Sequence, residues 1–362
     1  MTTTAVTAAP TVPYEIRRIG VLMSPDPQRS EEREGVLNPA VATDAEGAVW
    51  LFPRLVAEGN FSRVGRAEVV REGGHPSGVR RDGIALEPER TWESGGAHGG
   101  TEDPRITRID DLGLFVMTYV AFGPTGPRTA LAVSDDARSW RRLGPLQFSY
   151  ADDLDLDLNL FPNKDVVFFP EPVPGPDGRP SIALLHRPMW DLSFVRPDHD
   201  VRLPASVTDA RPSIWISYVS LDDARRDPAA LTRPQGHRLL AAPEQDWERL
   251  KIGAGPAPVR IPEGWLLVYH GVSGTIEGSV FTPQPDVHYA VGAMILDAGD
   301  PTRILARTVS PLMTPETAGE REGIVANVVF PTAIERIDDR DYVFYGMADS
   351  RIGLAELVRR QS

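Results

Sequence analysis

The amino-acid sequence predicts an all-β protein, and more specifically a five-bladed β-propeller. Three observations lead to this fold class. Long stretches of helical periodicity are hard to find, short apolar and β-branched runs dominate instead, and one segment plan recurs along the chain. The 32 glycines and 34 prolines fit a protein of many short strands and turns better than a helical bundle.

Each recurring segment contains a strand, a turn rich in Gly, Pro or Asp, and a second strand that carries aromatic residues. The segments begin at Asn38, Glu102, Asn163, Gly253 and Asn327. They start roughly 60 to 90 residues apart, which leaves room for one four-stranded blade in each repeat. Radial packing of five blades would bring the first residues of every repeat to a central funnel. A β-sandwich with coincidental spacing is the alternative.

The repeats predict a single catalytic domain over residues 15–362, preceded by a flexible N-terminal tail at residues 1–14. The polar, proline-containing stretch from Asp191 to Arg211 is interpreted as an inserted loop and not as a domain boundary.

Composition restricts the partners and the location. A formal charge of -13 argues against nucleic acid or an anionic membrane as the main partner, because both require basic surfaces. The chain has no cysteine, which excludes disulfides and thiolate chemistry and fits a reducing cytoplasm. No membrane span and no signal-peptide pattern is found, so a cytoplasmic protein is expected. A homo-oligomer is compatible with the sequence, which leaves the oligomeric state open.

The first candidate for chemistry is the run Glu102-Asp103-Pro104-Arg105, which follows a glycine-rich stretch at the start of a strand. Burial could raise the pKa of one carboxyl group while the arginine keeps the other ionised, as general acid catalysis requires. The plainer interpretation is a turn with a surface salt bridge.

Basic residues recur at comparable strand ends in different repeats, where they would form an anion site if they converge on the funnel. The set is Arg54, Arg63, Arg128, Lys164, Arg187 and His270. For any one of them a solvated strand cap is the better explanation, but their recurrence across repeats favours an anion site.

Other candidates serve sugar binding. Asp165 and Asp349 could hydrogen-bond hydroxyl groups or cap turns. An aromatic wall for a sugar ring could come from Tyr119, Trp265, Tyr269 and Tyr345, although such residues usually belong to the core. The histidines lack ligand spacing, so no metal and no cofactor is expected.

Taken together, several segments resemble glycoside hydrolase family 130, the mannoside phosphorylases and related mannosidases. The segments are GGTEDPRIT, NKDVVFFPEPV with LLHRP, IWISYVS, WERLKIGAGPAPV with GWLLVYHGV, YAVGAMILDAGDPTRILART, and NVVFPTA with YGMADSRIGLAEL. The likeness extends from about Asn38 to Leu357, and it implies the same five-bladed propeller.

The resemblance implies an inverting β-mannoside phosphorylase. Asp103 would be the acid that protonates the leaving oxygen through the mannose 3-hydroxyl. Inorganic phosphate, a co-substrate, would attack the anomeric carbon from the opposite face and release α-mannose 1-phosphate and a shortened sugar. The phosphate is already a nucleophilic anion, so the protein needs only to position it and offset its charge.

Matching the motifs residue by residue assigns the remaining roles. The phosphate-binding set would be Arg63, Arg128, Lys164 and His270, with Arg54 as a weaker member. Mannose would be bound by Asn38, Asp165 and Asp349, with Glu102, Arg187 and Tyr269 as further substrate-binding candidates.

Two alternatives remain at this stage. One is an inverting β-1,2-mannosidase on the same fold, whose base would be Glu93, Glu102 or Glu277. The other is a mannoside-binding propeller without catalysis. Two departures leave the acceptor open: Pro53 stands where a tyrosine is expected before Arg54, and the divergent stretch between Arg71 and Glu93 adds Arg80 and Arg81.

Overall fold

The computed structural model describes residues 11–95, 98–190, 203–277 and 284–360. These residues are mostly β-strands, with a few short helices between them. The all-β prediction is therefore confirmed. The predicted loop between Asp191 and Arg211 lies mostly outside the described residues, as do the first ten residues of the predicted tail.

The described strands form five antiparallel groups that follow one another along the chain. Group 1 contains β2 (Gly35–Thr43), β3 (Val49–Ala57), β4 (Phe61–Glu72) and β5 (His75–Leu86). Group 2 contains β6 (Gly99–Ile109), β7 (Leu114–Gly123), β8 (Gly126–Ser134) and β9 (Arg141–Pro145). A short parallel pairing of Phe61 with Gly99 and of Ser62 with Gly100 joins groups 1 and 2 into one sheet.

Group 3 contains β10 (Asn163–Phe168), β11 (Val173–Pro174), β12 (Pro180–Pro188), β13 (Ile214–Ser220) and β14 (Gln235–Ala241). Group 4 contains β15 (Lys251–Ala254), β16 (Val259–Ile261), β17 (Gly264–Gly274), β18 (Val287–Leu296) and β19 (Ile304–Arg307). Group 5 contains β20 (Val329–Ile337), β21 (Arg340–Met347), β22 (Arg351–Arg359) and the N-terminal strand β1 (Tyr14–Met23). The pairing of β1 with β22 brings the two ends of the chain together.

The α-helices of the described residues are α1 (Leu221–Arg226) and α2 (Ala318–Arg321). Short 3-10 turns connect other strands, at Ser30–Glu32, Asp110–Leu112, Leu158–Leu160, Pro228–Thr232 and Asp246–Glu248. Within the described ranges, no helix has both the length and the apolar character needed to cross a membrane.

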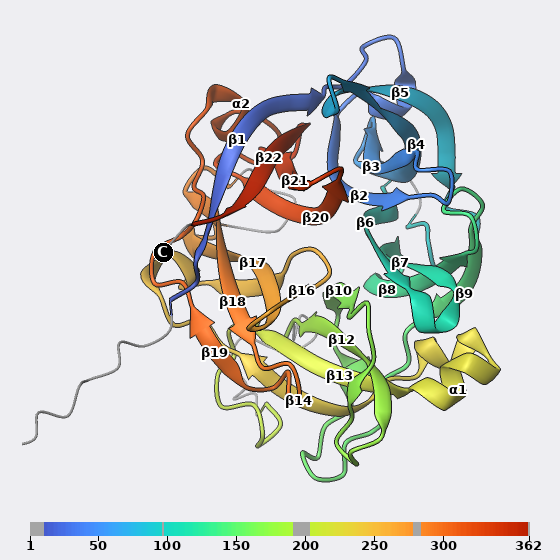
Figure 1. The fold of residues 1–362 in the computed structure, drawn as a ribbon, viewed down its shortest axis with the longest axis vertical. Helices are drawn as coiled ribbons and strands as arrows, with labels where there is room; N and C mark the ends of the chain where they lie inside the picture. The colour runs from blue at the N-terminus through green and yellow to red at the C-terminus, as the bar shows by residue number, and fades with distance from the viewer. Residues whose placement is uncertain (1–10, 96–97, 191–202, 278–283, 361–362) are drawn as a thin grey trace, which may run out of the picture.

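Hydrophobic clusters lie between successive groups and make up the core. One cluster joins groups 1 and 2, and others join groups 2 and 3, groups 3 and 4, and groups 4 and 5. A further cluster packs group 5 against group 1, with Phe344 and Leu354 facing Leu51. Figure 1 shows the groups placed around a common centre, each followed by the next. Every group thus buries its apolar faces against two neighbours.

The first strand of each group lies nearest to the centre. β2 contacts β6 and β20, and β10 contacts β6 and β15. Four of these strands carry a β-bulge: the register shifts at Pro331/Ala333 in β20, and at Leu37/Ala40, Glu102/Arg105 and Lys164/Val167 in the other three. Asn38, Asp103 and Asp165 occupy the last three of these bulges with φ angles of 43°, 46° and 56°. Bulges re-aim side chains, so the sheet itself turns these three polar residues out of the regular strand alternation.

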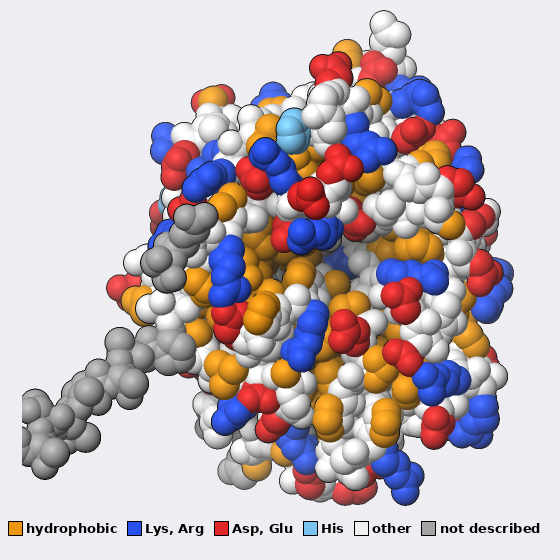
Figure 2. All heavy atoms as spheres, in the orientation of Figure 1, with side chains coloured by type: hydrophobic (Ala, Val, Ile, Leu, Met, Phe, Trp, Pro, Cys, Tyr) orange, Lys and Arg blue, Asp and Glu red, His pale blue; other side chains and the backbone are white. Residues whose placement is uncertain are grey.

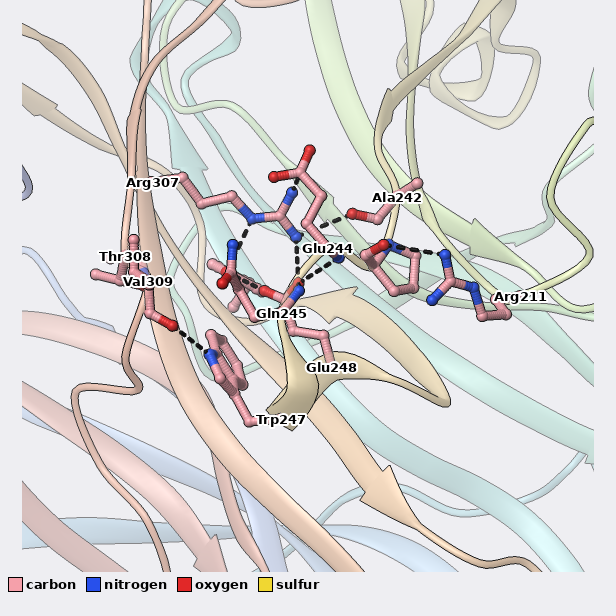
Figure 3. A network of polar contacts seen from close by, with 12 residues as sticks. Arg211, Ala242, Glu244, Gln245, Trp247, Glu248, Arg307, Thr308 and Val309 are labelled. Atoms are coloured by element: carbon pink, nitrogen blue, oxygen red, sulfur yellow. Dashed lines mark hydrogen bonds and ion pairs between the residues drawn. The ribbon is translucent and has the colours of Figure 1, made fainter. Parts of the chain in front are cut away.

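A buried glutamate braces the outer part of several groups. In group 4, Glu248 accepts hydrogen bonds from the Tyr269 hydroxyl at 2.5 Å and from Arg307 Nη2 at 2.7 Å. It also accepts the backbone N–H groups of Glu244 and Gln245, as Figure 3 shows for this turn. Burial of a carboxyl group is costly unless it is paired and hydrogen-bonded in this way.

The same arrangement recurs in two other groups. Glu93 holds Tyr119 and Arg142 in group 2. Glu320 holds Tyr345 and Arg18 in group 5. The interpretation of Glu93 as a catalytic base is therefore wrong, because both of its oxygens are occupied inside a closed network.

We expect Glu248→Gln to lower the free energy of unfolding by roughly 3 kcal/mol, because the buried Arg307 would lose its buried carboxylate partner and keep only the exposed Glu244. Urea unfolding followed by circular dichroism measures the change. The matched control is Glu263→Gln, which removes the exposed partner of Arg359 and should leave stability unchanged. Equal effects of the two substitutions would contradict this account of the network.

Candidate active site

Asp103 lies at the bulge of β6, where two neighbouring strands contribute its partners. Asn38 of β2 donates from Nδ2 to Asp103 Oδ1 at 2.8 Å. Arg54 of β3 donates from Nη1 to the same oxygen at 3.1 Å and from Nη2 to Glu102 Oε1 at 3.0 Å. No described residue donates a hydrogen bond to the second oxygen of Asp103, which is left for a ligand or for solvent. The predicted run of two adjacent carboxyl groups therefore forms a polar cluster at the centre of the molecule, and the interpretation as a surface salt bridge is wrong.

Arg54 is more central than its weak place in the predicted phosphate set suggested. Besides the two carboxylates, it donates from Nε to Ser62 Oγ at 2.9 Å and from Nη2 to Asn60 Oδ1 at 3.1 Å. Each of its nitrogens already contacts a protein acceptor. The structure thus shows Arg54 holding the carboxyl pair in place.

The three carboxyl groups of this cluster differ in pKa. Burial opposes ionisation of Asp103, but the nearby charges of Arg54 and Lys164 outweigh it, so the pKa of Asp103 is lowered. Burial raises the pKa of Glu102 against the same cations. Burial and the charge of Asp103 raise the pKa of Asp349 to about 6. The expected separation of pKa values is present, and Glu102 and Asp349, not Asp103, have the raised pKa values in the free protein.

A second centre surrounds Asp165 at the bulge of β10. Arg187 donates from Nε to Asp165 Oδ2 at 2.5 Å, and Arg105 donates from Nη2 to Asp165 Oδ1 at 3.2 Å. Arg105 also donates to the carbonyl oxygen of Gly255 at 2.6 Å. Burial opposes ionisation of Asp165, but the guanidinium charges of Arg187 and Arg105 lower its pKa.

The close approach of these chains requires a glycine at position 253. A Cβ atom there would clash with Asp165 Oδ2 and would lie 2.5 Å from His270 Cε1. Any larger residue would push β15 away from the centre. This explains why the fourth repeat opens on glycine where others open on Asn or Glu.

His270 of β17 closes the second centre. Its Nε2 lies 3.6 Å from Asp165 Oδ2, and its ring stacks on Tyr289 and meets Phe330 edge-on. The side chain is 1% exposed, and burial lowers the pKa of His270 well below its usual value. His270 is therefore neutral at pH 7.

Lys164 of β10 and Arg128 of β8 lie on neighbouring strands where group 3 meets group 2. The charge of Lys164 acts on the first centre, where it lowers the pKa of Asp103. Lys164 Nζ lies 6.0 Å from the ring centroid of Phe122. Arg128, which is opposite Ala121 in the register of β7 and β8, donates to the carbonyl oxygen of Phe161 at 2.8 Å. Figure 2 shows one face hollowed near its middle, with acidic and basic side chains around the hollow.

Several predicted residues lie elsewhere. Arg63 pairs with Glu87 at 2.7 Å and stacks on Phe61, on the opposite side of β4 from Ser62. Tyr269 is fully buried and bound to Glu248, so its predicted role in substrate binding is not supported.

The predicted aromatic wall is wrong. Its four members are core residues with at most 2% exposure, namely Tyr119, Trp265, Tyr269 and Tyr345.

Arg81 pairs with the buried Glu32 and Arg80 with Glu68, so both are engaged in ion pairs at group 1. Glu277, a further candidate base, is exposed and donates its backbone N–H to Gln284.

Four buried polar atoms around the two centres have no hydrogen-bond partner among the described residues. They are Asn38 Oδ1, Asn163 Oδ1, Arg187 Nη1 and His270 Nδ1. An unpaired buried polar group costs roughly 1–3 kcal/mol, and such groups call for a ligand or water. Sequence reasoning named the other three and missed Asn163, although it stands next to Lys164. No group of three or more metal-ligating side chains occurs in the ranges that the structure covers.

Comparison with known proteins identifies the class. The model of glycoside hydrolase family 130, described as β-1,4-mannooligosaccharide phosphorylase, matches residues 235–361. A 1,2-β-oligomannan phosphorylase of Thermoanaerobacter sp. (strain X514) is 30% identical over 344 residues, covering 93% of this chain and 94% of that protein. The chain therefore belongs to glycoside hydrolase family 130.

Further relatives support the same placement. A β-1,2-mannobiose phosphorylase of the same organism is 28% identical over 369 residues, with 94% of this chain and 95% of that protein covered. The solved structure of β-1,2-mannobiose phosphorylase from Listeria innocua, in complex with β-1,2-mannobiose, shares the fold. Its TM-score is 0.66 at 22% identity, with 94% of this chain and 96% of that chain covered.

The raised pKa of Asp349 predicts a pH-dependent stability. The folded protein binds a proton at Asp349 more tightly than the unfolded chain, in which this carboxyl group has its ordinary pKa of 3.8. The contribution of Asp349 to stability is therefore largest below about pH 4 and is lost as the pH rises to about 6, by about 1–3 kcal/mol. Asp349→Asn should remove this loss and be the more stable protein at pH 7. Urea unfolding of both proteins between pH 4 and 8 tests this, and parallel pH curves would contradict it.

Proposed function

We propose that this protein is an inverting β-mannoside phosphorylase that uses inorganic phosphate to release α-mannose 1-phosphate from a β-mannosyl oligosaccharide. The observation that carries the proposal is the site itself. Asn38 and Arg54 order a carboxyl pair on which the charge of Lys164 acts, and His270 closes the neighbouring centre around Asp165. Asn38 Oδ1, Arg187 Nη1 and His270 Nδ1 are buried there without partners among the described residues. A polyol and a phosphate together supply the acceptors and donors that these atoms lack.

The proposal includes the architecture. The five groups pack in a ring, and group 5 packs back on group 1, which supports a five-bladed β-propeller forming one catalytic domain. The first strands of the blades would then line the central funnel.

Asp103 is proposed as the acid. In the free protein Arg54 and Lys164 keep it ionised. A phosphate dianion bound beside Lys164 would offset the lysine charge, and the pKa of Asp103 would rise on binding. The proton would then pass through the mannose 3-hydroxyl to the leaving oxygen, while Asn38 and Arg54 hold the carboxyl group in position.

Phosphate is proposed to bind to Lys164, Arg128 and His270. Lys164 and Arg128 supply charge. The neutral imidazole contributes a hydrogen bond through Nδ1, which has no partner among the described residues of the free protein. Arg63 gains no support from its placement, because its guanidinium is engaged by Glu87. Mannose is proposed to bind to Asn38, Arg187, Asp165 and Asp349.

The substrate proposed is a β-1,2-linked mannoside. The relatives aligned over more than 90% of this chain are described as acting on β-1,2 linkages. A β-1,4-mannooligosaccharide phosphorylase of Ruminococcus albus aligns over only 33% of it. A cytoplasmic location suits this reaction, because a charged sugar phosphate stays inside the cell and keeps part of the glycosidic bond energy.

The direct test is incubation with β-1,2- and β-1,4-mannobiose, with and without phosphate, followed by ³¹P and ¹H NMR. Phosphate-dependent α-mannose 1-phosphate from the β-1,2 disaccharide is expected. Free mannose at equal rates with and without phosphate would make the protein a mannosidase instead. Binding without turnover would make it a sugar-binding protein.

Variants separate the proposed roles. Asp103→Asn should lower kcat by at least about 1,000-fold, because the transferred proton is lost. His270→Ala should raise the KM for phosphate about tenfold or more while changing the KM for mannoside little. An unchanged phosphate KM in His270→Ala would remove His270 from the phosphate site.

A further inference from the structure

Four buried polar side chains of group 3 form a continuous hydrogen-bonded chain that the proposed reaction does not use. Asn163 Nδ2 lies 3.0 Å from His186 Nδ1, and His186 Nε2 lies 2.8 Å from Ser217 Oγ. Ser217 Oγ lies 2.8 Å from His237 Nδ1. His237 Nε2 lies 2.8 Å from the backbone carbonyl oxygen of Ser149. We call these four side chains the histidine relay.

One end of the relay determines the direction of every hydrogen bond in it. The carbonyl oxygen of Ser149 can only accept, so His237 donates from Nε2 and keeps a lone pair at Nδ1. Ser217 therefore donates to His237 and accepts from the Nε2–H of His186. His186 then accepts at Nδ1 from the amide NH₂ of Asn163. Both histidines are neutral Nε2–H tautomers in this arrangement.

The surroundings favour the neutral forms. Burial and the nearby His237 lower the pKa of His186 well below its usual value. Burial also lowers the pKa of His237, and Arg238 adds to this effect. The hydrogen bond to the Ser149 carbonyl oxygen and the acidic residues nearby, Asp153 and Asp157, oppose it. The pKa of His237 is lowered less far than that of His186, and Asp153, which pairs with Arg238 at 2.9 Å, offsets the charge of Arg238. His237 is therefore the histidine of the relay that takes up a proton first.

The inner end of the relay is next in the chain to residues of the proposed site. Asn163 opens β10 directly before Lys164 and Asp165. Its backbone carbonyl oxygen accepts a hydrogen bond of 2.9 Å from the hydroxyl group of Thr129. Thr129 follows Arg128 in β8. The Asn163 side chain is buried, and its Oδ1 atom has no partner among the described residues. The relay therefore leaves an acceptor, and not a donor, at its inner end, one residue before Lys164 in β10.

We propose that His186, Ser217 and His237 are positioning residues that set the orientation of the Asn163 amide, and that acid reverses it. One proton is taken up from solvent. The proton on Ser217 Oγ moves to His237 Nδ1, so His237 becomes charged. The proton on His186 Nε2 moves to Ser217 Oγ, and the added proton binds to His186 Nδ1. His186 remains neutral but now donates to Asn163, whose amide turns so that Oδ1 accepts. The unpartnered end of Asn163 changes from acceptor to donor.

The consequence reaches the site through Asn163 alone. At neutral pH the amide oxygen of Asn163 can accept a hydrogen bond from a sugar hydroxyl group or from the P–OH group of phosphate. After reversal the NH₂ group would face the same ligand, and that hydrogen bond would be lost. The relay thus makes the polarity of one contact at the site depend on the charge of a histidine farther along the relay.

The test uses the full chain labelled with ¹⁵N-histidine and long-range ¹H–¹⁵N spectra between pH 8 and 5. Spectra of His186→Gln and His237→Gln assign two of the seven histidines. We expect both to be neutral Nε2–H tautomers at pH 7.5. As His237 becomes charged, His186 should move to the Nδ1–H tautomer with the same midpoint.

Two variants separate coupling from general destabilisation. Ser217→Ala cuts the relay, so the His186 signal should no longer follow the His237 titration. Tyr119→Phe is the matched control, because it removes one buried hydroxyl from the Glu93 network of group 2 and leaves the relay intact. It should keep the coupling.

Three results would overturn the proposal. These are an Nδ1–H or charged form of either histidine at pH 7.5, a His186 tautomer that does not change while His237 titrates, and coupling that persists in Ser217→Ala. The spectra need no turnover, so they stand whether or not the protein is a phosphorylase.

Discussion

Charges buried in a protein must be paired, and this constraint organises the middle of the molecule. Asp165 remains ionised because Arg105 and Arg187 flank it, and Asp103 because Arg54 and a neighbouring amide hold it. Removing one member of such a set costs about 3–5 kcal/mol. The β-bulges of the first strands bring these partners together, at a strain of roughly 1–3 kcal/mol for each left-handed residue. The clusters between strand groups supply the stability that maintains this strain.

Much of this arrangement can be predicted from the sequence. The repeated segments identify the strand groups, because a strand, a turn and a second strand recur with similar spacing. They also identify Asn38, Asp103 and Lys164, since each stands where a repeat begins and all first strands meet at the centre. Strand alternation explains why two predicted residues do not join the centre. Tyr269 is adjacent to His270 and Arg63 to Ser62, so each points to the opposite face of its strand.

Other features depend on contacts that no local pattern contains. The relay joins Asn163, His186, Ser217 and His237, which come from four different strands. Their separations follow no motif, and only the sheet register aligns them. The buried glutamates do leave a signal, because a proline precedes Glu93, Glu248 and Glu320 by five residues in each case. The members of this repeat lie between the strands, outside the repeated strand segments. The pKa order at Asp103 has no sequence signal either, since it depends on how close Arg54 and Lys164 come.

The most direct test of the central claim is a crystal structure of the Asp103→Asn variant with β-1,2-mannobiose and phosphate. The account predicts a mannose ring over the carboxyl pair and a phosphate between Lys164 and Arg128. Asn38 Oδ1, Arg187 Nη1 and His270 Nδ1 should each gain a hydrogen-bond partner from a ligand or an ordered water. Ligands bound away from these atoms, with the atoms still unpaired, would contradict the assignment of this centre as the active site.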